Sequence, residues 1–251
     1  MIWRLLTEQE INIIYEQHMK RDFPPEELPP FPPAMELIAS GEGWFFGIFD
    51  KEQDGGTEGA HEVKQDGGTE GAHEVKQDEM NCDIDLEDLA AYMQVLKPEV
   101  CSYALLNYYA VLPAYRNQGL GERLLGELQM HLPKVQGIII EAEIPKKSED
   151  AGIAQRRLGF YERVGAVNTM WQEQVYDAWY YVLVKLFADG GVGQALDDLQ
   201  MCYQRLFTKL QYQQAFGLWD DKGNVISARP KHLKLDRDNQ IQGVMLVAKK
   251  E

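Results

Sequence analysis

The sequence predicts a mixed α/β fold in which helices flank a sheet. Apolar runs of strand type alternate with amphipathic segments, as where a leucine face over residues 119–132 precedes the buried-type run 137–144. The run 101–112 lies before that helix, so strand, helix and strand follow at the spacing of a parallel βαβ crossover. Residues 97–99 form a turn between the runs 89–96 and 101–112, which predicts that these two strands pair with each other.

The first fifty residues predict two strands and two helices. Thr7 and Glu10 have the spacing of a capping box, which places a helix start at Glu8. Six of the eleven prolines fall between Phe23 and Pro33, and because proline fixes φ we expect an extended connection there. The elements predicted here are a strand over residues 1–6, a helix over 8–20, a short helix over 34–40 and a strand over 43–50.

The second half of the chain continues the alternation of helices and strands. Gly165 follows a helical pattern and is typical of a helix C-terminus. The glycine-rich turn before residue 195 has no basic residue close behind it, so we interpret it as a helix cap and not as an anion site. The elements predicted are helices over 150–164 and 195–213, strands over 166–172 and 178–187, a hairpin of 216–219 with 225–228, and a final strand over 241–248.

A perfect tandem duplication separates two of these strands. Residues 53–64 recur unchanged as residues 65–76, and each copy holds three acids, one lysine and almost nothing to bury. This composition predicts a flexible acidic loop, inserted at about residues 51–80. His61 and His73 lie in the two copies, but no other ligand spacing supports a metal site, so a solvated loop is preferred and no metal is predicted.

Charge and cysteine content exclude several classes of protein. The chain has 25 basic and 40 acidic residues, a net charge of −15, which repels phosphate backbones and disfavours nucleic-acid binding. Three scattered cysteines form neither a disulfide framework nor a zinc motif. No apolar run reaches the length of a membrane span, and no signal peptide is recognisable. A protein of the reducing cytoplasm, with no membrane partner, is therefore expected.

A glycine turn before the long helix is the most informative motif. Arg116, Gly119 and Gly121 form an RxxGxG pattern between a strand and a helix start. Glycines allow close backbone approach, and the first helical N–H groups are unpaired at the positive end of the dipole, so the turn predicts an anion cradle suited to a diphosphate. A plain turn before a helix remains the alternative. A Walker A loop is excluded because the Gly-Lys-Ser/Thr ending is missing, and a dinucleotide fingerprint because Arg116 replaces its first glycine.

A second motif lies one strand downstream, in the helix that reads RRLGFYERVGA. Phe160 and Val164 fit a core face, and Tyr161 taken alone is interpreted as a core-edge tyrosine. With the glycine turn at the right separation, however, the chain resembles the GNAT superfamily of acetyl-CoA-dependent N-acetyltransferases, in a bacterial-type small-molecule or an uncharacterised subgroup. The resemblance covers residues 1–187 as the acetyltransferase domain, and leaves 188–251 as a C-terminal helix-plus-hairpin extension.

The resemblance implies a fold, a reaction and a set of residues. It implies a mostly antiparallel central sheet with a splayed parallel strand pair, and acetyl transfer from acetyl-CoA to an amine by direct attack on the thioester. Tyr161 would be the general acid at the sulfur. The residues implied to bind the cofactor are Tyr109, Ala110, Val111, Arg116, Asn117, Gln118, Gly119, Leu120, Gly121, Arg156, Phe160 and Tyr161.

The acceptor side is less defined by the sequence. The strand before the glycine turn carries no acid, so Glu141 and Glu143, on one face of the next strand, are the candidates for the general base. Surface ion pairing is the equal alternative for both. Trp44 and Tyr108 are candidates to line a pocket for a small-molecule or peptide amine, and a homodimer is allowed. A catalytically silent CoA-binding module and a pure interaction protein are the competing functional hypotheses.

Overall fold

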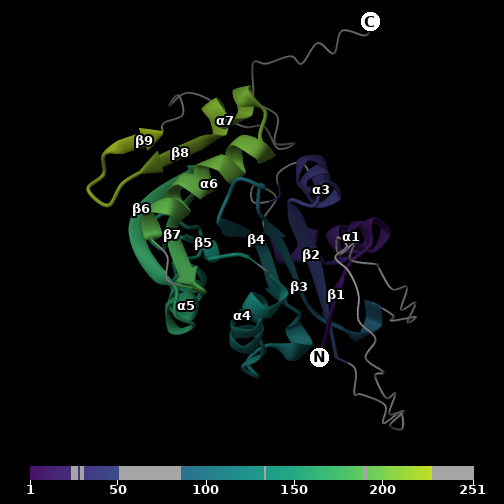
Figure 1. Ribbon diagram of the computed structural model, residues 1–251. Coiled ribbons are helices and arrows are strands. Elements are labelled where there is room, and N and C mark those ends of the chain that lie inside the picture. Colours follow the sequence, from purple (N-terminus) through teal and green to yellow (C-terminus); the bar gives the residue numbers. More distant parts are fainter. Residues whose placement is uncertain (24–27, 29–30, 51–85, 133, 189–190, 228–251) are drawn as a thin grey trace, which may run out of the picture.

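One nine-stranded sheet organises the chain (Figure 1). The structure is a computed structural model that describes residues 1–23, 28, 31–50, 86–132, 134–188 and 191–227. The strand order is β1-β2-β3-β4-β5-β7-β6-β8-β9, and the pair β4–β5 is parallel whereas every other pair in the described sheet is antiparallel. The strands are β1 (Ile2–Leu5), β2 (Gly43–Phe49), β3 (Leu89–Leu96), β4 (Tyr103–Val111), β5 (Gly137–Glu143), β6 (Val167–Val175), β7 (Ala178–Leu186), β8 (Phe216–Trp219) and β9 (Val225–Ser227). The predicted mixed α/β class is confirmed.

Helices cover both faces of the sheet. The leucines of α4 and Leu158 of α5 pack with one set of alternating strand residues. The helices α1, α3 and α6 cover the opposite face, where Tyr92, Tyr103 and Ile139 are completely buried. The helices are α1 (Glu8–Ile14), the π-helical turn η1 (Tyr15–Met19), α2 (Lys20–Asp22), α3 (Phe31–Ala39), α4 (Leu120–His131), α5 (Ala151–Arg163), α6 (Val192–Leu206) and α7 (Lys209–Ala215), with 3₁₀ turns η3 (Leu86–Asp88) and η4 (Pro113–Tyr115).

The N-terminal helix begins where the capping box predicts. The Glu10 amide donates to the Thr7 hydroxyl at 3.3 Å, and the Glu10 carboxylate accepts from the Thr7 amide at 2.8 Å. The helical path runs on to Asp22 through the π-helical turn η1, two residues beyond the predicted end. The buried side chains of Ile11 and Ile14 pack this helix against the sheet.

The predicted start of the helix after the proline-rich segment is wrong. The helix predicted to start at residue 34 begins at Phe31, because the first turn of a helix tolerates Pro32 and Pro33, whose missing N–H groups would have no intrahelical partner there. The extended connection predicted to reach Pro33 is therefore shorter, and residues 24–27 and 29–30 of it lie outside the described residues.

The single helix predicted over residues 195–213 is also wrong, because two helices occupy this range. Phe207 and Thr208 have extended backbone between α6 and α7. Thr208 then starts α7 with a capping box to Gln211, whose amide donates to the Thr208 hydroxyl at 3.3 Å. The break allows α6 to lie on the sheet and α7 to lead directly into β8.

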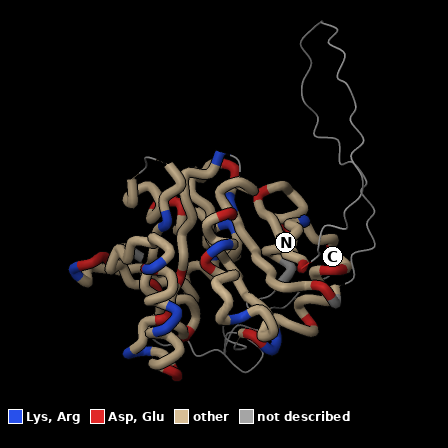
Figure 2. The backbone as a smooth tube through the Cα atoms, turned by 90° about the horizontal axis from the view of Figure 1, so that it is seen from below, with Lys and Arg blue, Asp and Glu red and all other residues tan. Residues whose placement is uncertain are grey.

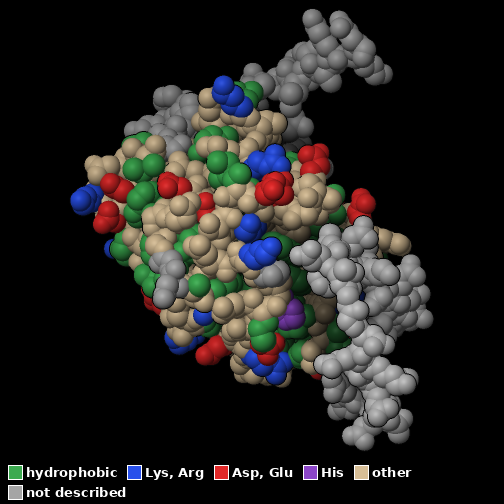
Figure 3. All heavy atoms as spheres, viewed as in Figure 1, with side chains coloured by type: hydrophobic (Ala, Val, Ile, Leu, Met, Phe, Trp, Pro, Cys, Tyr) green, Lys and Arg blue, Asp and Glu red, His purple; other side chains and the backbone are tan. Residues whose placement is uncertain are grey.

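The residues after β7 continue the same sheet. Strand β8 pairs with β6 from Gln172↔Trp219 to Val175↔Phe216, and β9 pairs with β8 as the predicted hairpin. The duplicated acidic segment and the strand predicted over 241–248 lie outside the described residues. Basic and acidic residues are interspersed along the described backbone (Figure 2), and hydrophobic side chains are scattered among polar ones on the face shown in Figure 3. Within the described part of the chain, no helix has the length and apolarity to cross a membrane.

Candidate active site

The site lies where β4 and β5 separate. The two strands pair over only three positions, from Tyr103↔Gly137 to Leu105↔Ile139. Beyond that point β4 continues to Val111 and β5 to Glu143 without pairing to each other, while β3 and β7 hold their outer edges. The two strands thus form a V, open toward the N-terminus of α4. The splayed pair implied by the family resemblance is present in the fold.

A bulge in β4 marks the start of the open region. The register against β3 shifts between Gln94 and Val95, which leaves Asn107 as the extra residue of β4. The Asn107 amide donates to the side-chain oxygen of Gln94, which is completely buried. After the bulge, Tyr108 packs toward the α1 side of the sheet and Tyr109 toward the α4 side.

The glycine turn presents an uncapped helix start. Asn117 and Gly119 both have left-handed backbone, with φ of 61° and 75°, and Gly119 is the N-cap of α4. A Cβ at Gly119 would meet no atom within 4 Å, so the space above the turn is open. Side chains cap α1, α5 and α7, but none caps α4. The N–H groups of its first turn are therefore available to an anion.

Arg116 borders this turn and is held by two elements. Its Nε donates to the Val111 carbonyl at 2.7 Å, and its guanidinium lies 3.7 Å from the carboxylate of Asp22. Asp22 also accepts from the Tyr92 hydroxyl at 3.1 Å and from Arg21. The cationic edge of the cradle is thus tied both to the end of β4 and to α2.

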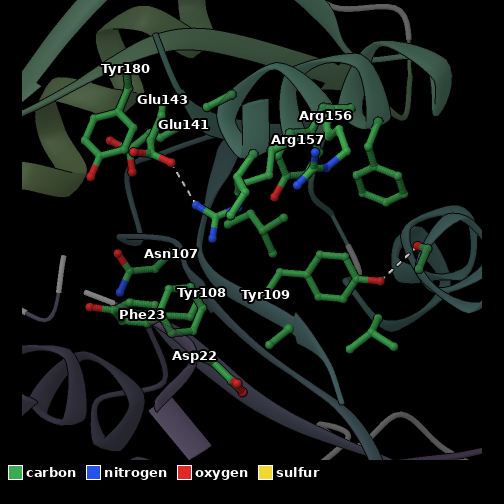
Figure 4. A pocket seen from close by; sticks show the side chains of 18 of the residues that line it. Asp22, Phe23, Asn107, Tyr108, Tyr109, Glu141, Glu143, Arg156, Arg157 and Tyr180 are labelled. Atoms are coloured by element: carbon green, nitrogen blue, oxygen red, sulfur yellow. Dashed lines mark hydrogen bonds and ion pairs between the residues drawn. The ribbon is translucent and has the colours of Figure 1, made fainter. Parts of the chain in front are cut away.

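One cavity of about 1060 Å³ joins the cradle to the opposite face of the sheet. It runs from the α4 start through the gap between β4 and β5 to the surface of α6, and Figure 4 shows side chains entering it from both strands. The predicted site residues that line it are Tyr108, Tyr109, Ala110, Val111, Arg116, Asn117, Gly119, Leu120, Gly121, Glu141, Glu143, Arg156, Phe160 and Tyr161.

Two predicted residues do not line this cavity. Trp44, on β2, packs against the hydrophobic cluster beneath α4. The Gln118 side chain turns back and donates to the Ala114 carbonyl at 2.9 Å, so only its backbone belongs to the cradle.

Tyr161 enters the cavity from α5 beside Phe160, with 5.2 Å between ring centroids. Tyr109 comes from β4 on the same face, and its hydroxyl donates to the Gly121 carbonyl at 2.9 Å (Figure 4). Burial, together with the neighbouring Tyr161, raises the pKa of Tyr109 well above its usual range. Tyr109 therefore stays neutral at ordinary pH and donates to the first turn of α4.

The two candidate bases have different environments. Glu143 accepts from Arg157 at 2.9 Å and from the Ser148 hydroxyl at 2.9 Å. Its carboxylate is thus engaged by an arginine. Glu141 accepts from the Tyr203 hydroxyl at 2.6 Å, and no lysine or arginine among the described residues forms an ion pair with it.

Sequence reasoning missed two residues next to Glu141. Glu173 of β6 is completely buried, and no lysine, arginine or backbone N–H of the described chain satisfies its carboxyl oxygens. Its polar neighbours are Glu141 and Tyr203. Burial raises the pKa of Glu141, and burial together with the charge of Glu141 raises the pKa of Glu173 well above its usual range. Burial and the adjacent carboxyl group of Glu141 thus both favour the neutral form of Glu173.

A recognisable signal could have found both residues. Glu173 occupies an inward position between Trp171 and Val175, and an acid in the buried alternation of a strand is unusual. Tyr203 lies on the core face of α6, seven residues after Leu196.

Comparison with protein families gives one match to this chain. Residues 82–165 match the model of the acetyltransferase (GNAT) domain. This range contains the glycine turn, both splayed strands and the helix with Tyr161. It ends before Glu173 and Tyr203. No curated protein matches the chain.

Three solved structures that resemble this chain are distant from it in sequence. A GNAT-family acetyltransferase from Bacteroides thetaiotaomicron is 17% identical, with a TM-score of 0.49 over 79% of this chain and 93% of that one. The ribosomal-protein-S18-alanine N-acetyltransferase of Escherichia coli is 17% identical, with a TM-score of 0.44 over 76% and 96%. NAA60 of Arabidopsis thaliana, solved with acetyl-CoA, is 10% identical, with a TM-score of 0.45 over 74% and 98%.

Proposed function

We propose that the protein is a GNAT-type acetyltransferase, as the match of residues 82–165 to that domain indicates, and that it transfers the acetyl group of acetyl-CoA to an amine by direct attack on the thioester. The observation that carries the proposal is the single cavity that joins the uncapped start of α4 to Tyr161 through the gap between β4 and β5. In this proposal, the cradle holds one substrate, and the α6 side of the same cavity receives the other.

The cradle has the chemistry needed for a diphosphate. The N–H groups after Gly119 have no side-chain cap, and Arg116 stands at their border. Helix N-termini favour anions because of these unpaired donors and the helix dipole. Arg156, on α5, is exposed at the mouth of the cavity and is the cation that we assign to the remaining phosphate end of the nucleotide.

The splayed strands supply the groups that would orient the thioester. From Leu106 to Val111, the edge of β4 that faces β5 has no strand partner. Apart from the Val111 carbonyl, which accepts from Arg116, its backbone would hydrogen-bond the pantetheine arm, and one of its N–H groups would donate to the oxyanion formed by attack. One preorganised donor of this kind lowers the barrier by about 3 kcal/mol.

Tyr161 is the group we assign as the proton donor to the leaving thiolate. The neutral amine attacks the carbonyl carbon, the C–N bond forms, and collapse of the tetrahedral species breaks the C–S bond. The phenol gives its proton to sulfur, and the attacking nitrogen returns a proton to the phenolate. An ordinary phenol, with a pKa of about 10, is acidic enough for this exchange.

The proposal is tested by measuring thiol release from acetyl-CoA in a panel of monoamines, polyamines, amino acids and peptides. Acetyl-CoA affinity is measured separately by calorimetry. We expect binding together with release of free CoA in the presence of at least one amine class. Binding without thiol release across the panel would contradict the enzymatic proposal and favour a silent CoA-binding module. An absence of binding would contradict the cradle itself.

A further inference from the structure

Helix α6 crosses the gap between β4 and β5 on one face of the sheet. The buried carboxylate of Asp198 accepts from the backbone N–H groups of Ser102 and Tyr103, at 2.8 and 2.9 Å, where β4 begins. On the other strand of the gap, Glu141 of β5 accepts from the Tyr203 hydroxyl at 2.6 Å. The helix is thus attached to both strands of the V.

The same helix is also attached to the N-terminal half of the chain. It contacts α3, and Ala34 and Leu37 of α3 share a buried cluster with Leu199 of α6 (Figure 1). Arg205 forms an ion pair with Glu42, in the turn between α3 and β2. Because packed interiors resist deformation, α6 is a firm cover over this side of the cavity.

The C-terminal end of α6 supplies an end wall to the cavity. Phe207 leaves helical geometry, with φ of −109° and ψ of 146°, and its ring centroid lies 5.6 Å from that of Tyr176 and 5.4 Å from that of Tyr203. Leu206 lies next to it in the lining. These four side chains, which we call the end wall, line the cavity although they are only 2–7% exposed. Protein therefore lies directly behind them, and the cavity ends there.

The rest of the lining is chemically mixed. Its polar side chains include Arg21, Asp22, Asn107, Glu141, Glu143, Tyr180 and Gln211. Arg21 is paired with Asp22, and Glu143 with Arg157. A lining of this kind suits polar and apolar ligands alike, so the end wall limits a ligand by its size and not by its charge.

The space that remains for an acceptor is small. The whole cavity measures about 1060 Å³, and the proposed function gives the gap between β4 and β5 to the pantetheine arm. Pockets of roughly 300–1,000 Å³ bury most of a drug-sized ligand. An acceptor whose nitrogen meets the thioester at the gap directs its body toward the end wall, so only a part of this volume is available to it.

We propose that Leu206 and Phe207 set a length limit on the acceptor, so that the substrates are amines of small molecules and not of polypeptides. This inference rests on the proposed function and deepens it. Both residues lie beyond residue 165, where the match to the family model ends, so the limit comes from a part of the chain that the match does not cover. They contact the body of the acceptor and take no part in proton transfer.

The first test uses acceptors that differ in length. One series runs from glycinamide to pentaglycinamide, with one amine in each member, and 1-alkylamines from ethyl to octyl form an apolar series. Binding is measured by calorimetry and turnover by thiol release from acetyl-CoA. We expect kcat/KM to fall by at least about tenfold from the best to the longest member of each series. Equal use of all lengths would overturn the length limit.

The second test moves the end wall in both directions. Leu206→Ala removes atoms from it and should raise kcat/KM by at least about tenfold for the shortest amine that the wild type rejects. Leu206→Phe adds atoms and should shift the limit to shorter amines. Thermal unfolding shows whether each variant is folded, and Phe207→Leu is the milder enlargement if Leu206→Ala is not.

Leu196→Ala is the matched control for Leu206→Ala. Leu196 is buried to a similar extent in the same helix and the same cluster, but it does not line the cavity. Both alanine variants should lose stability, since each removes a buried side chain. The control should nevertheless keep the length limit of the wild type. A limit that moves equally in both variants would show that the end wall does not set it.

Acetyl-CoA affinity separates the two hypotheses. It should be unchanged in all of these variants, because the cradle lies at the other end of the cavity. If acetyl-CoA binds and reacts but the variants at residues 206 and 207 keep the wild-type length profile, the length limit is wrong and the proposed function stands. If no amine releases thiol but calorimetry shows a length limit in amine binding that moves in these variants, the proposed function is wrong and the end wall stands. An absence of both amine binding and thiol release would overturn both.

Discussion

The hydroxyl of Tyr109 donates to the carbonyl of Gly121 at 2.9 Å. This bond joins the free end of the splayed strand β4 to the first turn of α4. Space at this point is tight, because a Cβ at Gly121 would lie 3.2 Å from that hydroxyl and 3.3 Å from the ring of Phe160. The end of β4 and the start of α4 are therefore parts of one rigid unit.

Tyr109→Phe should loosen this unit without changing its shape. We expect a loss of about 1 kcal/mol in the free energy of unfolding, since the Gly121 carbonyl loses its side-chain donor. Acetyl-CoA affinity should fall by a few-fold. Calorimetric titration and thermal unfolding measure both effects. Tyr212→Phe, on α7 and outside the cavity, is the matched control. Wild-type values for both quantities in Tyr109→Phe would show that the bond has no positioning role.

Tyr161→Phe should slow the chemical step and leave binding intact. The variant keeps the ring that packs beside Phe160 and removes only the phenolic proton. We expect kcat to fall by about 10²–10⁴-fold, because a positioned general acid contributes this much. Acetyl-CoA affinity should stay within about twofold of wild type. A variant that turns over at the wild-type rate would exclude Tyr161 as the proton donor.

Glu173→Gln should become more stable than the wild type as the pH rises. The pKa of Glu173 is raised well above its usual range, so the folded state holds a proton that the unfolded state releases above a pH of about 4.5. Wild-type stability should therefore fall with increasing pH from that point until the pH passes the raised pKa. The stability of the variant should not show this decrease with pH, because glutamine does not titrate. Thermal unfolding from pH 4 to 9 measures the difference, and a gap that does not grow with pH would contradict a neutral Glu173.

Glu10→Gln tests the opposite sign of linkage. Burial opposes ionisation of Glu10, but hydrogen bonds from Arg4 and Thr7 outweigh it and lower the pKa to about 2. The carboxylate therefore stabilises the fold above a pH of about 4.5, and this contribution is lost as the pH falls toward 2. We expect Glu10→Gln to cost about 1 kcal/mol at neutral pH, since the ion pair is partly exposed. Denaturant unfolding should show the two proteins converging at low pH.

Local patterns predicted the elements around the start of α4 well. The glycine turn, the leucine face of α4 and the strand that carries Glu141 are contiguous in sequence, and each imposes its own local structure. The boundary errors also have local causes. The capping pair Thr208 and Gln211 signals a new helix within a continuous helical periodicity.

The contacts on the α6 side of the cavity could not be predicted in this way. Glu141 and Tyr203 are separated by 62 positions and meet only because α6 lies across β4 and β5. Glu173 reaches them from β6, on the far side of β7 in the sheet order. Such contacts depend on strand order and helix placement, which no short pattern encodes. The same reason explains why Trp44 was predicted to line the pocket. Its position in the strand carries no information about which hydrophobic cluster it packs against.

The central claim, that the start of α4 binds the diphosphate of acetyl-CoA, is tested most directly by the affinity of Gly119→Glu for acetyl-CoA. Gly126→Glu is the matched control, because it adds the same charge to an exposed position of α4 with open space around it. Thermal unfolding corrects for the strain of a side chain at a φ of 75°. We predict that Gly119→Glu weakens binding by at least about tenfold, through bulk and charge repulsion, while Gly126→Glu binds like wild type. Equal affinities in all three proteins would contradict the claim.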